Sequence, residues 1–388
     1  MTDYDLVIIG CGIHGAGVAQ AAAASGYTVL VLEKNSAPGL ETSARSSKLI
    51  HGGLRYLEGL DFRLVRECLE ERQRLLQNAP ELVKLVPFHI PIYQQTTRRA
   101  WQIFLGLSIY TLFSHVGFRI VPKIEWSSLD GLRTDDLKSV FTYYDAQTND
   151  TLLTNAVLNS AQSIGAECIL DAELLKATRQ EDEYNIVYQH KGQNITCTAH
   201  AIVNAAGPWL NQVSNKISPT PDMPAIELIQ GTHIVIPGTP ERGMYYLEAP
   251  RDKRAVFVMP WQGKTLVGTT ESPFTGDPSK VHPLDDEMDY LLEVYNHYFR
   301  ANYHRDDIIN AFAGLRVLEK STMRAFKRSR DVTFAMDDTE CPRVIAIYGG
   351  KLTSYRATGE RTIKLLKGTL PLRKRREDTR LLPLRSRN

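Results

Sequence analysis

Three glycines near the start of the chain are spaced to bind a pyrophosphate. Gly10, Gly12 and Gly15 follow a short apolar run and precede an alanine-rich stretch. In such a turn the first glycine makes the tight bend, the second lets the backbone approach the pyrophosphate, and the third lets a helix pack closely on a strand. The helix N-terminus then directs free N–H groups and a positive dipole end at the phosphates. The spacing therefore predicts a dinucleotide site.

The elements around this motif have the order that such a site requires. Residues 4–9 are expected to form a buried strand, because residues 6–9 are all apolar. A helix over residues 16–25 and a second strand over residues 28–32 follow. Glu33 stands at the end of that second strand, where a carboxylate accepts ribose hydroxyls and would repel the extra phosphate of NADP. This order favours a dinucleotide site over a glycine turn in an unrelated βα unit.

A second glycine-rich turn lies near the other end of the chain. Residues 345–348 are expected to form a strand, Gly349 and Gly350 follow it, and a helix runs to about Lys367. A protein that uses NAD generally has no second unit of this kind. In flavoproteins of the glutathione-reductase-like class, such a helix faces the pyrimidine end of the isoalloxazine and stabilises negative charge on the reduced ring. The two turns together favour FAD.

Further blocks of sequence stand out at residues 46–58, 204–209, 231–235, 257–261, 268–270, 314–316 and 349–356. Together these blocks resemble the FAD-dependent (respiratory) glycerol-3-phosphate dehydrogenases, within the D-amino-acid-oxidase-like flavoproteins. The blocks follow the order of that family over roughly residues 4–368, and the first and last are the most specific. Two features depart from the family: Val317 stands where proline is usual, and the chain stops shortly after its final helix, where the family normally continues into a further helical domain.

The resemblance implies a mixed α/β fold. It is expected to combine a glutathione-reductase-like FAD-binding Rossmann domain with an interleaved antiparallel-sheet substrate domain. Helical patterns over residues 61–78, 148–164 and 285–303 and alternating β-branched and aromatic residues over 226–271 agree with this. The implied division is residues 1–85, 146–217 and 308–370 for the FAD domain, 86–145 and 218–307 for the substrate domain, and 371–388 for a basic tail.

The same resemblance implies which residues contact the cofactor. We expect non-covalent FAD, although a histidine near the position of His51 bonds covalently to the flavin in some related amine dehydrogenases. The five scattered cysteines contain no CxxC pair, so no metal site is expected. The expected FAD contacts are Gly10, Gly12, Ile13, His14, Gly15, Glu33, Lys34, Ser46, Ser47, Lys48, Leu49, His51, Gly52, Ala206, Gly207, Trp209, Gly350, Lys351, Leu352 and Thr353.

Oxidation of a secondary alcohol needs a base, an anchor for the anionic end of the substrate, and a wall that fixes the reacting carbon. Arg55 and Arg316 are the expected phosphate anchors, because a guanidinium binds phosphate oxygens bidentately. The amine or amide of Lys351 can face substrate or flavin, because the residue lies between a glycine pair and a helix start. Surface or structural ion pairs are the alternative for the two arginines, and a solvated lysine at a helix start is the alternative for Lys351.

His233 is the expected base, because imidazole titrates near working pH. A hydrogen-bonded core histidine is the alternative for His233, and His51 is the rival base. Tyr56 and Thr270, with Thr269, are expected to be hydrogen-bonding neighbours of the substrate.

The implied reaction is oxidation of sn-glycerol 3-phosphate to dihydroxyacetone phosphate, with hydride transfer to FAD N5 and electrons passed to a quinone-type acceptor. One alternative is an FAD-dependent oxidase or dehydrogenase of an amino acid, secondary amine or 2-hydroxy acid, and another is a flavin-binding subunit without turnover. An amino acid would need one carboxylate anchor, whereas Arg55, Arg316 and Lys351 favour a dianionic phosphate. His233, present with these cations, disfavours a protein without turnover.

The net charge and the hydropathy of the sequence indicate where the protein is located and what it binds. The formal net charge is +2, nothing indicates a nucleic-acid partner, and Asp3 and Asp5 argue against a secretory signal, so a cytoplasmic protein is expected. Residues 100–113 are apolar but too short to span a bilayer, and either lie in a membrane interface or belong to the core. The tail over residues 372–388 is rich in arginine; it either contacts an anionic membrane or is solvated and disordered, with the second slightly preferred. The family resemblance favours peripheral contact with the inner face of the membrane.

Overall fold

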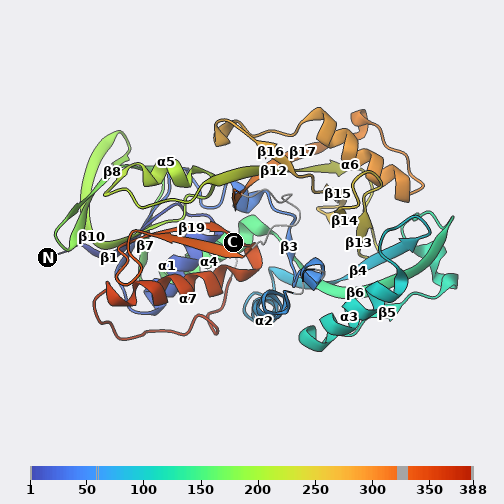
Figure 1. The fold of residues 1–388 in the computed structure, drawn as a ribbon, viewed down its shortest axis with the longest axis horizontal. Coiled ribbons are helices and arrows are strands. Elements are labelled where there is room, and N and C mark those ends of the chain that lie inside the picture. The colour runs from blue at the N-terminus through green and yellow to red at the C-terminus, as the bar shows by residue number, and fades with distance from the viewer. Residues whose placement is uncertain (1, 58, 60, 321–330, 386–388) are drawn as a thin grey trace.

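The computed structural model describes residues 2–57, 59, 61–320 and 331–385, apart from the side chain of Arg55. Figure 1 shows two sheets side by side along the longest axis of the molecule, each covered by helices. This is the mixed α/β architecture expected from the sequence. The chain passes repeatedly between the two sheets, as the interleaved organisation requires.

The first sheet contains the strand that precedes the first glycine turn. Strands β1, β2, β7, β10 and β19 pair in parallel, and antiparallel strands extend this group on two sides. The strands of this sheet are β1 (Tyr4–Ile9), β2 (Val29–Leu32), β7 (Ala166–Ile169), β8 (Ala172–Gln180), β9 (Glu183–His190), β10 (Gln193–Asn204), β11 (Ile217–Ser218), β18 (Val332–Met336) and β19 (Val344–Gly349).

Three helices pack on one another beside this sheet: α1 (Ile13–Ala24), α4 (Asp150–Ser163) and α7 (Tyr355–Leu365). Helix α1 is buried almost all round, which explains its uniformly small, apolar sequence. Its Gly17 lies against α7. A Cβ on Gly17 would be 2.9 Å from Tyr355 O, and a Cβ on Gly359 would be 2.4 Å from Gly17 O. These glycines let the helices of the two predicted turns pack in direct contact.

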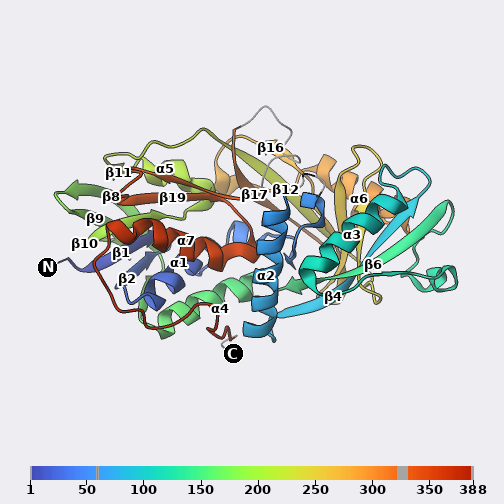
Figure 2. The ribbon, with the colours of Figure 1, turned by 60° about the horizontal axis from the view of Figure 1, so that its bottom comes forward.

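The second sheet is mostly antiparallel, with one parallel pair between β4 and β13. Helix α6 (Asp285–Tyr298) packs against strands from the β12–β15 region, α3 (Ala100–Ser114) packs near β6, and α2 (Phe62–Asn78) lies between the two halves of the molecule (Figure 2). The strands are β3 (Leu49–Ile50), β4 (Val83–Tyr93), β5 (Arg119–Ile120), β6 (Leu137–Thr148), β12 (Ile226–Ile236), β13 (Met244–Glu248), β14 (Ala255–Trp261), β15 (Lys264–Gly268), β16 (Ser272–Phe274) and β17 (Asn310–Glu319).

Two details differ from the sequence pattern. Helix α6 ends at Tyr298, before the expected residue 303, because Phe299 has an extended backbone. Strand β17 pairs with β12 in the second sheet, whereas the pattern groups residues 308–370 with the first unit. Sheet membership therefore changes within that range, between β17 and β18. The exact domain boundaries stay a prediction.

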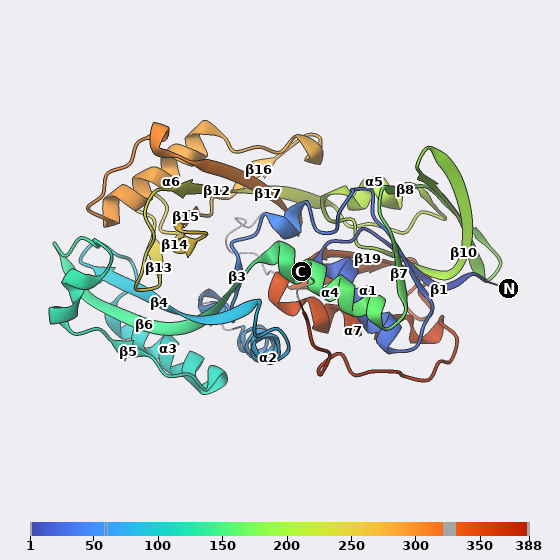
Figure 3. The ribbon, with the colours of Figure 1, turned by 180° about the vertical axis from the view of Figure 1, so that it is seen from behind.

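The expectation of a disordered tail is wrong for its described part. Residues 371–385 return along α1 and α7 towards α2 (Figure 3), and Thr379, Leu382 and Leu384 are buried. The Leu384 N–H donates to Asn78 O over 2.7 Å. The segment is therefore packed on the helices through these residues, while most of its other residues are exposed to solvent.

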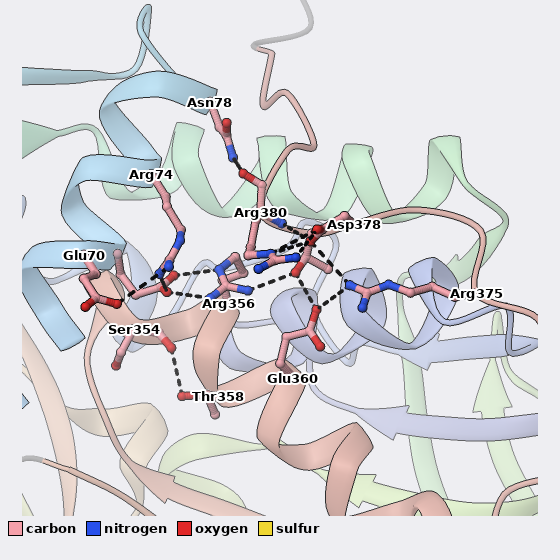
Figure 4. Close-up of polar contacts among 12 residues, drawn as sticks. Glu70, Arg74, Asn78, Ser354, Arg356, Thr358, Glu360, Arg375, Asp378 and Arg380 are labelled. Atoms are coloured by element: carbon pink, nitrogen blue, oxygen red, sulfur yellow. Dashed lines mark hydrogen bonds and ion pairs between the residues drawn. The ribbon is translucent and has the colours of Figure 1, made fainter.

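Most arginines of this segment pair with nearby acids or carbonyls. Arg356 on α7 bonds both Glu71 and the Thr379 hydroxyl, and Asp378 accepts from Arg380 over 2.6 Å (Figure 4). Arg373 pairs with Asp5 over 2.9 Å. Part of the basic charge that suggested a membrane contact is therefore paired with acids of the protein, at Arg373, Arg375 and Arg380. Among the described residues, no helix is long and apolar enough to cross a membrane.

Candidate active site

A cavity of about 590 Å³ runs between the two glycine turns and the facing strands of the second sheet. Most of the residues expected from sequence to bind cofactor or substrate line it. They are Gly10, Gly12, Ile13, His14, Glu33, Lys34, Ser46, Ser47, Leu49, His51, Tyr56, Ala206, Gly207, Trp209, His233, Arg316, Gly350, Lys351, Leu352 and Thr353.

The first glycine turn is built for close backbone packing. A Cβ on Gly15 would lie 1.9 Å from Gly10 O, so only glycine fits where α1 meets the turn. The Ile13 N–H donates to the Ser43 hydroxyl over 2.9 Å, which holds the loop over residues 40–45 against the start of α1. Gly15 itself lies behind the cavity wall and acts through this packing.

Glu33 lies at the end of β2 beside the same turn. Its carboxylate accepts hydrogen bonds from the Cys11 N–H over 2.6 Å and the Asn35 N–H over 2.9 Å, and these two bonds hold the glycine turn in place. Burial raises the pKa of Glu33, while the two backbone N–H groups oppose that shift. Each carboxylate oxygen keeps a further lone pair, which is the group that a ribose hydroxyl requires.

The second glycine turn meets the first across the cavity. Gly349 and Gly350 both have positive φ, and a Cβ on Gly350 would lie 2.5 Å from His14 Nε2. Burial lowers the pKa of His14 to about 4, so this ring is neutral and can sit in the wall without a counter-ion. The two turns, Glu33 and the length of the lining fit an extended dinucleotide such as FAD, held mainly by backbone N–H groups.

His233 projects from β12 into the far end of the cavity. The side chain is almost fully buried, and its Nε2 lies 3.0 Å from Ser47 Oγ. The ring stacks on Phe312, with centroids 5.0 Å apart. Burial, and then the nearby cations Lys48 and Arg316, hold the pKa of His233 well below its usual value. The imidazole is therefore neutral near pH 7, the form in which it can accept a proton.

Arg316 reaches the same end of the cavity from β17. Its Nη1 donates to Glu271 Oε1 over 2.7 Å, and Arg254 donates to the other oxygen of Glu271 over 2.8 Å. A Cβ on Gly231 would lie 3.1 Å from Arg316 Nη2, so the glycine leaves room for the guanidinium. The two arginines share this carboxylate, and Arg254 also lies 3.9 Å from Asp252, so Glu271 fixes the position of Arg316 beside the cavity.

Lys351 supplies a second cation to the lining. Its ammonium lies 3.9 Å from the centre of the Tyr56 ring and donates to Cys68 Sγ over 3.2 Å. A cation held by an aromatic face and a thiol keeps some donor capacity for a ligand. Tyr56 and Lys351 thus stand together in the wall, as residues from distant parts of the sequence.

Besides Gly15, four expected contacts lie outside the lining: Lys48, Gly52, Thr269 and Thr270. The Thr270 hydroxyl donates to Glu287 over 2.8 Å, the Lys48 ammonium pairs with Asp150 over 2.7 Å, and the Gly52 N–H donates to the Tyr110 hydroxyl over 2.9 Å. These groups face the protein interior behind the cavity. The side chain of Arg55 lies outside the described residues, and the backbone of Arg55 belongs to a short 3-10 turn, Leu54–Leu57.

The sequence pattern missed the acids that hold these groups. Glu287 accepts hydrogen bonds from the side chains of Gln230, Thr232, Thr270 and Ser272, so one carboxylate on α6 joins β12 to the segment around β16. Burial alone would raise the pKa of Glu287, but these hydrogen bonds hold it below its usual value. Its place at the first turn of a helix gave only a helix-start signal.

Lys34 and Trp209 form a cation–ring contact in the cavity wall. The Lys34 ammonium lies 3.4 Å from the centre of the Trp209 ring, and both residues line the cavity together with Glu33. The cavity wall thus combines the backbone of the two glycine turns with the side chains of His233 and Arg316.

Comparisons with known proteins agree with this geometry. Residues 5–365 match the model of the family described as FAD dependent oxidoreductase. The chain is 35% identical to the D-erythritol 1-phosphate dehydrogenase of Brucella abortus (strain 2308) over 385 residues, covering 95% of this chain and 74% of the relative. It is 36% identical to the aerobic glycerol-3-phosphate dehydrogenase of Escherichia coli (strain K12) over 382 residues, covering 94% and 74%.

A solved structure supports the same assignment. The glycerol-3-phosphate dehydrogenase of Bacillus halodurans, complexed with FAD, superposes with a TM-score of 0.77 and 25% identity, covering 98% of this chain and 67% of that one. The chain therefore belongs to the FAD dependent oxidoreductase family, and it is an enzyme whose cofactor is FAD.

Proposed function

We propose that this enzyme oxidises the secondary hydroxyl of sn-glycerol 3-phosphate to give dihydroxyacetone phosphate. The observation that carries the proposal is the combination of Arg316, Lys351 and a buried neutral imidazole, His233, in the wall of one cavity. Two cations suit a dianionic phosphate better than a single carboxylate. The identities to two polyol-phosphate dehydrogenases support the same substrate class.

Each group then has a role. Arg316 and Lys351 bind the phosphate, with Arg316 oriented by Glu271. His233 accepts the proton of the substrate hydroxyl, because it is neutral and faces the cavity. FAD, when bound along the two glycine turns, supplies the acceptor for the hydride. His51 lines the cavity close to Thr353, so it stays a second candidate for the base.

A longer polyol phosphate is the second candidate substrate. The specific observation is the 35% identity to a D-erythritol 1-phosphate dehydrogenase, which is similar in extent to the match with the glycerol-3-phosphate enzyme. Both substrates would present a phosphate to Arg316 and a secondary hydroxyl to His233. They differ in the number of carbons between the phosphate and the far end, so the choice between them depends on the space around the reacting carbon.

Anaerobic reduction of the bound flavin tests the substrate class directly. Purified enzyme is mixed with sn-glycerol 3-phosphate, D-erythritol 1-phosphate, glycerol or an amino acid while the flavin absorbance is followed. We expect rapid bleaching with one of the phosphates and none with glycerol, because glycerol lacks the group that the cations bind. Bleaching by the amino acid alone would overturn the proposal.

Replacement of Arg316 tests the phosphate anchor. Arg316→Ala should lower the specificity constant for the phosphorylated substrate by about one to two decades, because loss of a charge-assisted contact costs about 1.5–3 kcal/mol. FAD content should change little. Arg98→Ala is the matched control, since Arg98 also pairs with a buried glutamate, Glu248, but lies outside the cavity lining. Equal losses in both variants would make Arg316 structural.

We also propose that the electrons pass to a quinone at the membrane surface, with α3 as the contact. One face of α3 packs on the protein through Ile103, Leu107 and Tyr110. The other face leaves large apolar side chains exposed, which is typical of a segment that lies in a membrane interface. These exposed side chains are Trp101, Phe104, Leu105 and Leu112.

Vesicle binding and acceptor assays test this second step. Trp101→Ser with Leu112→Ser should weaken sedimentation with lipid vesicles while substrate-driven flavin reduction stays unchanged. The wild-type enzyme should reduce a soluble quinone faster than molecular oxygen. Undiminished vesicle binding by the variant would remove α3 from the proposal, and a preference for oxygen would remove the quinone.

A further inference from the structure

We propose that Ser47 relays the substrate proton to His233 and that the buried Lys48–Asp150 pair holds Ser47 in place for this. The proposal rests on the proposed function, because it takes His233 as the base. It gives Ser47 a chemical role in addition to the expected contact with the cofactor. It also explains why a buried ion pair lies directly behind the reactive end of the cavity, at His233 and Arg316.

The imidazole of His233 is fixed in one orientation. A Cβ on Gly268 would lie 2.1 Å from its Cδ2, and Phe312 stacks on the ring with an interplanar angle of 16°. The ring therefore fills the space between a strand backbone and an aromatic face. This packing holds its Nε2 3.0 Å from Ser47 Oγ.

Ser47 is the described partner from which a proton can come. Its Oγ lies 3.0 Å from His233 Nε2, and both residues line the cavity. Among the described residues, His233 Nδ1 is buried and has no hydrogen-bond partner. A neutral imidazole with its proton on Nδ1 accepts at Nε2, so in this tautomer the serine hydroxyl donates to the base from within the cavity lining.

The backbone around Ser47 is held in an unusual shape. Lys48 has a φ of 60°, which is the left-handed region that a non-glycine residue adopts only when its surroundings impose it. The Ser46 N–H and hydroxyl both donate to Asp150 Oδ2, over 3.0 Å and 2.7 Å.

The Lys48 ammonium fixes the same turn from the other side. It donates to both carboxylate oxygens of Asp150 and to Ala44 O. Asp150 at the start of α4 therefore holds the turn around Ser47 through the Ser46 N–H, the Ser46 hydroxyl and the Lys48 ammonium. A turn that several contacts hold in one conformation is expected where a side chain must be positioned accurately.

The relay is balanced in atoms and charge. As the substrate C–H bond breaks and its electron pair leaves with the hydrogen as hydride, the substrate O–H proton passes to Ser47 Oγ. The original Ser47 proton passes at the same time to His233 Nε2. The products are the carbonyl compound, an unchanged serine and an imidazolium, and the two electrons reside in the cofactor that the established family reaction already supplies.

Two substitutions at Ser47 separate a relay from a structural role. Single-turnover reduction of bound FAD at saturating sn-glycerol 3-phosphate should be about 100-fold slower or more in Ser47→Ala, because it loses an acid–base step. Ser47→Thr keeps a hydroxyl and should recover most of the rate. The solvent deuterium isotope effect on reduction should shrink in Ser47→Ala. FAD content and substrate affinity should remain near wild type in both.

The outcomes distinguish this inference from the function on which it rests. If wild-type enzyme fails to reduce its flavin with any polyol phosphate, the proposed function falls and the relay falls with it. If wild type is active and Ser47→Ala reduces at the wild-type rate, only the relay is overturned. Loss of FAD from Ser47→Ala, with no recovery in Ser47→Thr, would also overturn it, because Ser47 would then serve the cofactor alone. Ser108→Ala, on exposed α3, is the control for an arbitrary serine loss.

Asp150→Asn tests the supporting part. It removes the charge that pairs with Lys48, so the turn should loosen and slow reduction less than Ser47→Ala does. The double variant Ser47→Ala with Asp150→Asn should then be no slower than Ser47→Ala, because both changes act through the same hydroxyl. Additive losses would show that Asp150 acts independently of Ser47.

Discussion

The two sheets contribute different kinds of group to one cavity. The first sheet supplies backbone, through turns in which Gly10, Gly12 and Gly350 line the cavity and a Cβ on Gly10 or Gly350 would meet neighbouring protein atoms. The second sheet supplies side chains, with His233 on β12 and Arg316 on β17. The glycine turns depend on the absence of side chains, whereas the charged side chains depend on partners that orient them.

This difference decides how each half can be damaged. A glycine turn is disrupted when a side-chain atom is added to one of its glycines, because the neighbouring backbone cannot move aside. A charged side chain fails when its partner is removed, because a buried group is left unsatisfied. The molecule therefore combines a rigid cofactor end with a reactive end whose geometry is set by hydrogen bonds to distant residues.

The largest effect is expected from a single methyl group in the first turn. Gly15→Ala places a Cβ where the Gly10 carbonyl oxygen lies 1.9 Å away, so the turn or α1 must shift. We expect purified Gly15→Ala to contain almost no FAD, as measured by the absorbance of the released flavin. Gly117→Ala is the control, since its Cβ meets nothing within 4 Å. Retention of normal FAD by Gly15→Ala would show that the turn is adaptable.

The reactive end should be sensitive to loss of a carboxylate that touches no ligand. Glu287→Ala leaves the Thr232 and Thr270 hydroxyls and the Gln230 amide without their acceptor. Unsatisfied buried donors should lower the free energy of unfolding by about 3 kcal/mol or more. Glu287→Gln should cost less, because the amide oxygen still accepts. Denaturant titration measures both, and equal stability of Glu287→Ala and wild type would contradict the role of this cluster.

The same contrast explains what the sequence could predict. The requirement for Gly10, Gly12 and Gly15 is local, so the first turn and its flanking strands could be recognised from spacing. The partners of the reactive groups come from far along the chain: Glu271 is 45 residues from Arg316, and Asp150 is 102 residues from Lys48. No periodicity connects such pairs, so the inward direction of Lys48 and the course of the tail could be seen only in the folded chain.

The tail gives a smaller effect on the side of the first sheet. Leu384 is buried, and its N–H is bonded to α2. Leu384→Ala should lower the free energy of unfolding by about 2–3 kcal/mol, which is the lower part of the range for buried leucine. The exposed Leu381 provides the control, since Leu381→Ala removes the same atoms from solvent-facing chain. Equal stability of the two variants would restore the picture of a solvated tail.

The smallest effect is a displacement of the pH profile at the reactive end. Burial, reinforced by Lys48 and Arg316, lowers the pKa of His233 from its ordinary value of 6.5. A base with a lowered pKa stays neutral to lower pH, so flavin reduction at saturating substrate should hold its rate as pH falls through 6.5 and decline only below it.

The stability of the protein should depend on pH in a different way, because in the unfolded chain the same histidine takes up its proton near the ordinary pKa. The contribution of His233 to stability is therefore present above that pH and is lost as the pH falls from there towards the lowered pKa. Over about pH 5 to 9, stopped-flow measurements give the rate of flavin reduction and thermal unfolding gives the stability. An acid limb of reduction centred above pH 6.5 would mean that the substrate-bound site raises this pKa, or that His51 is the base.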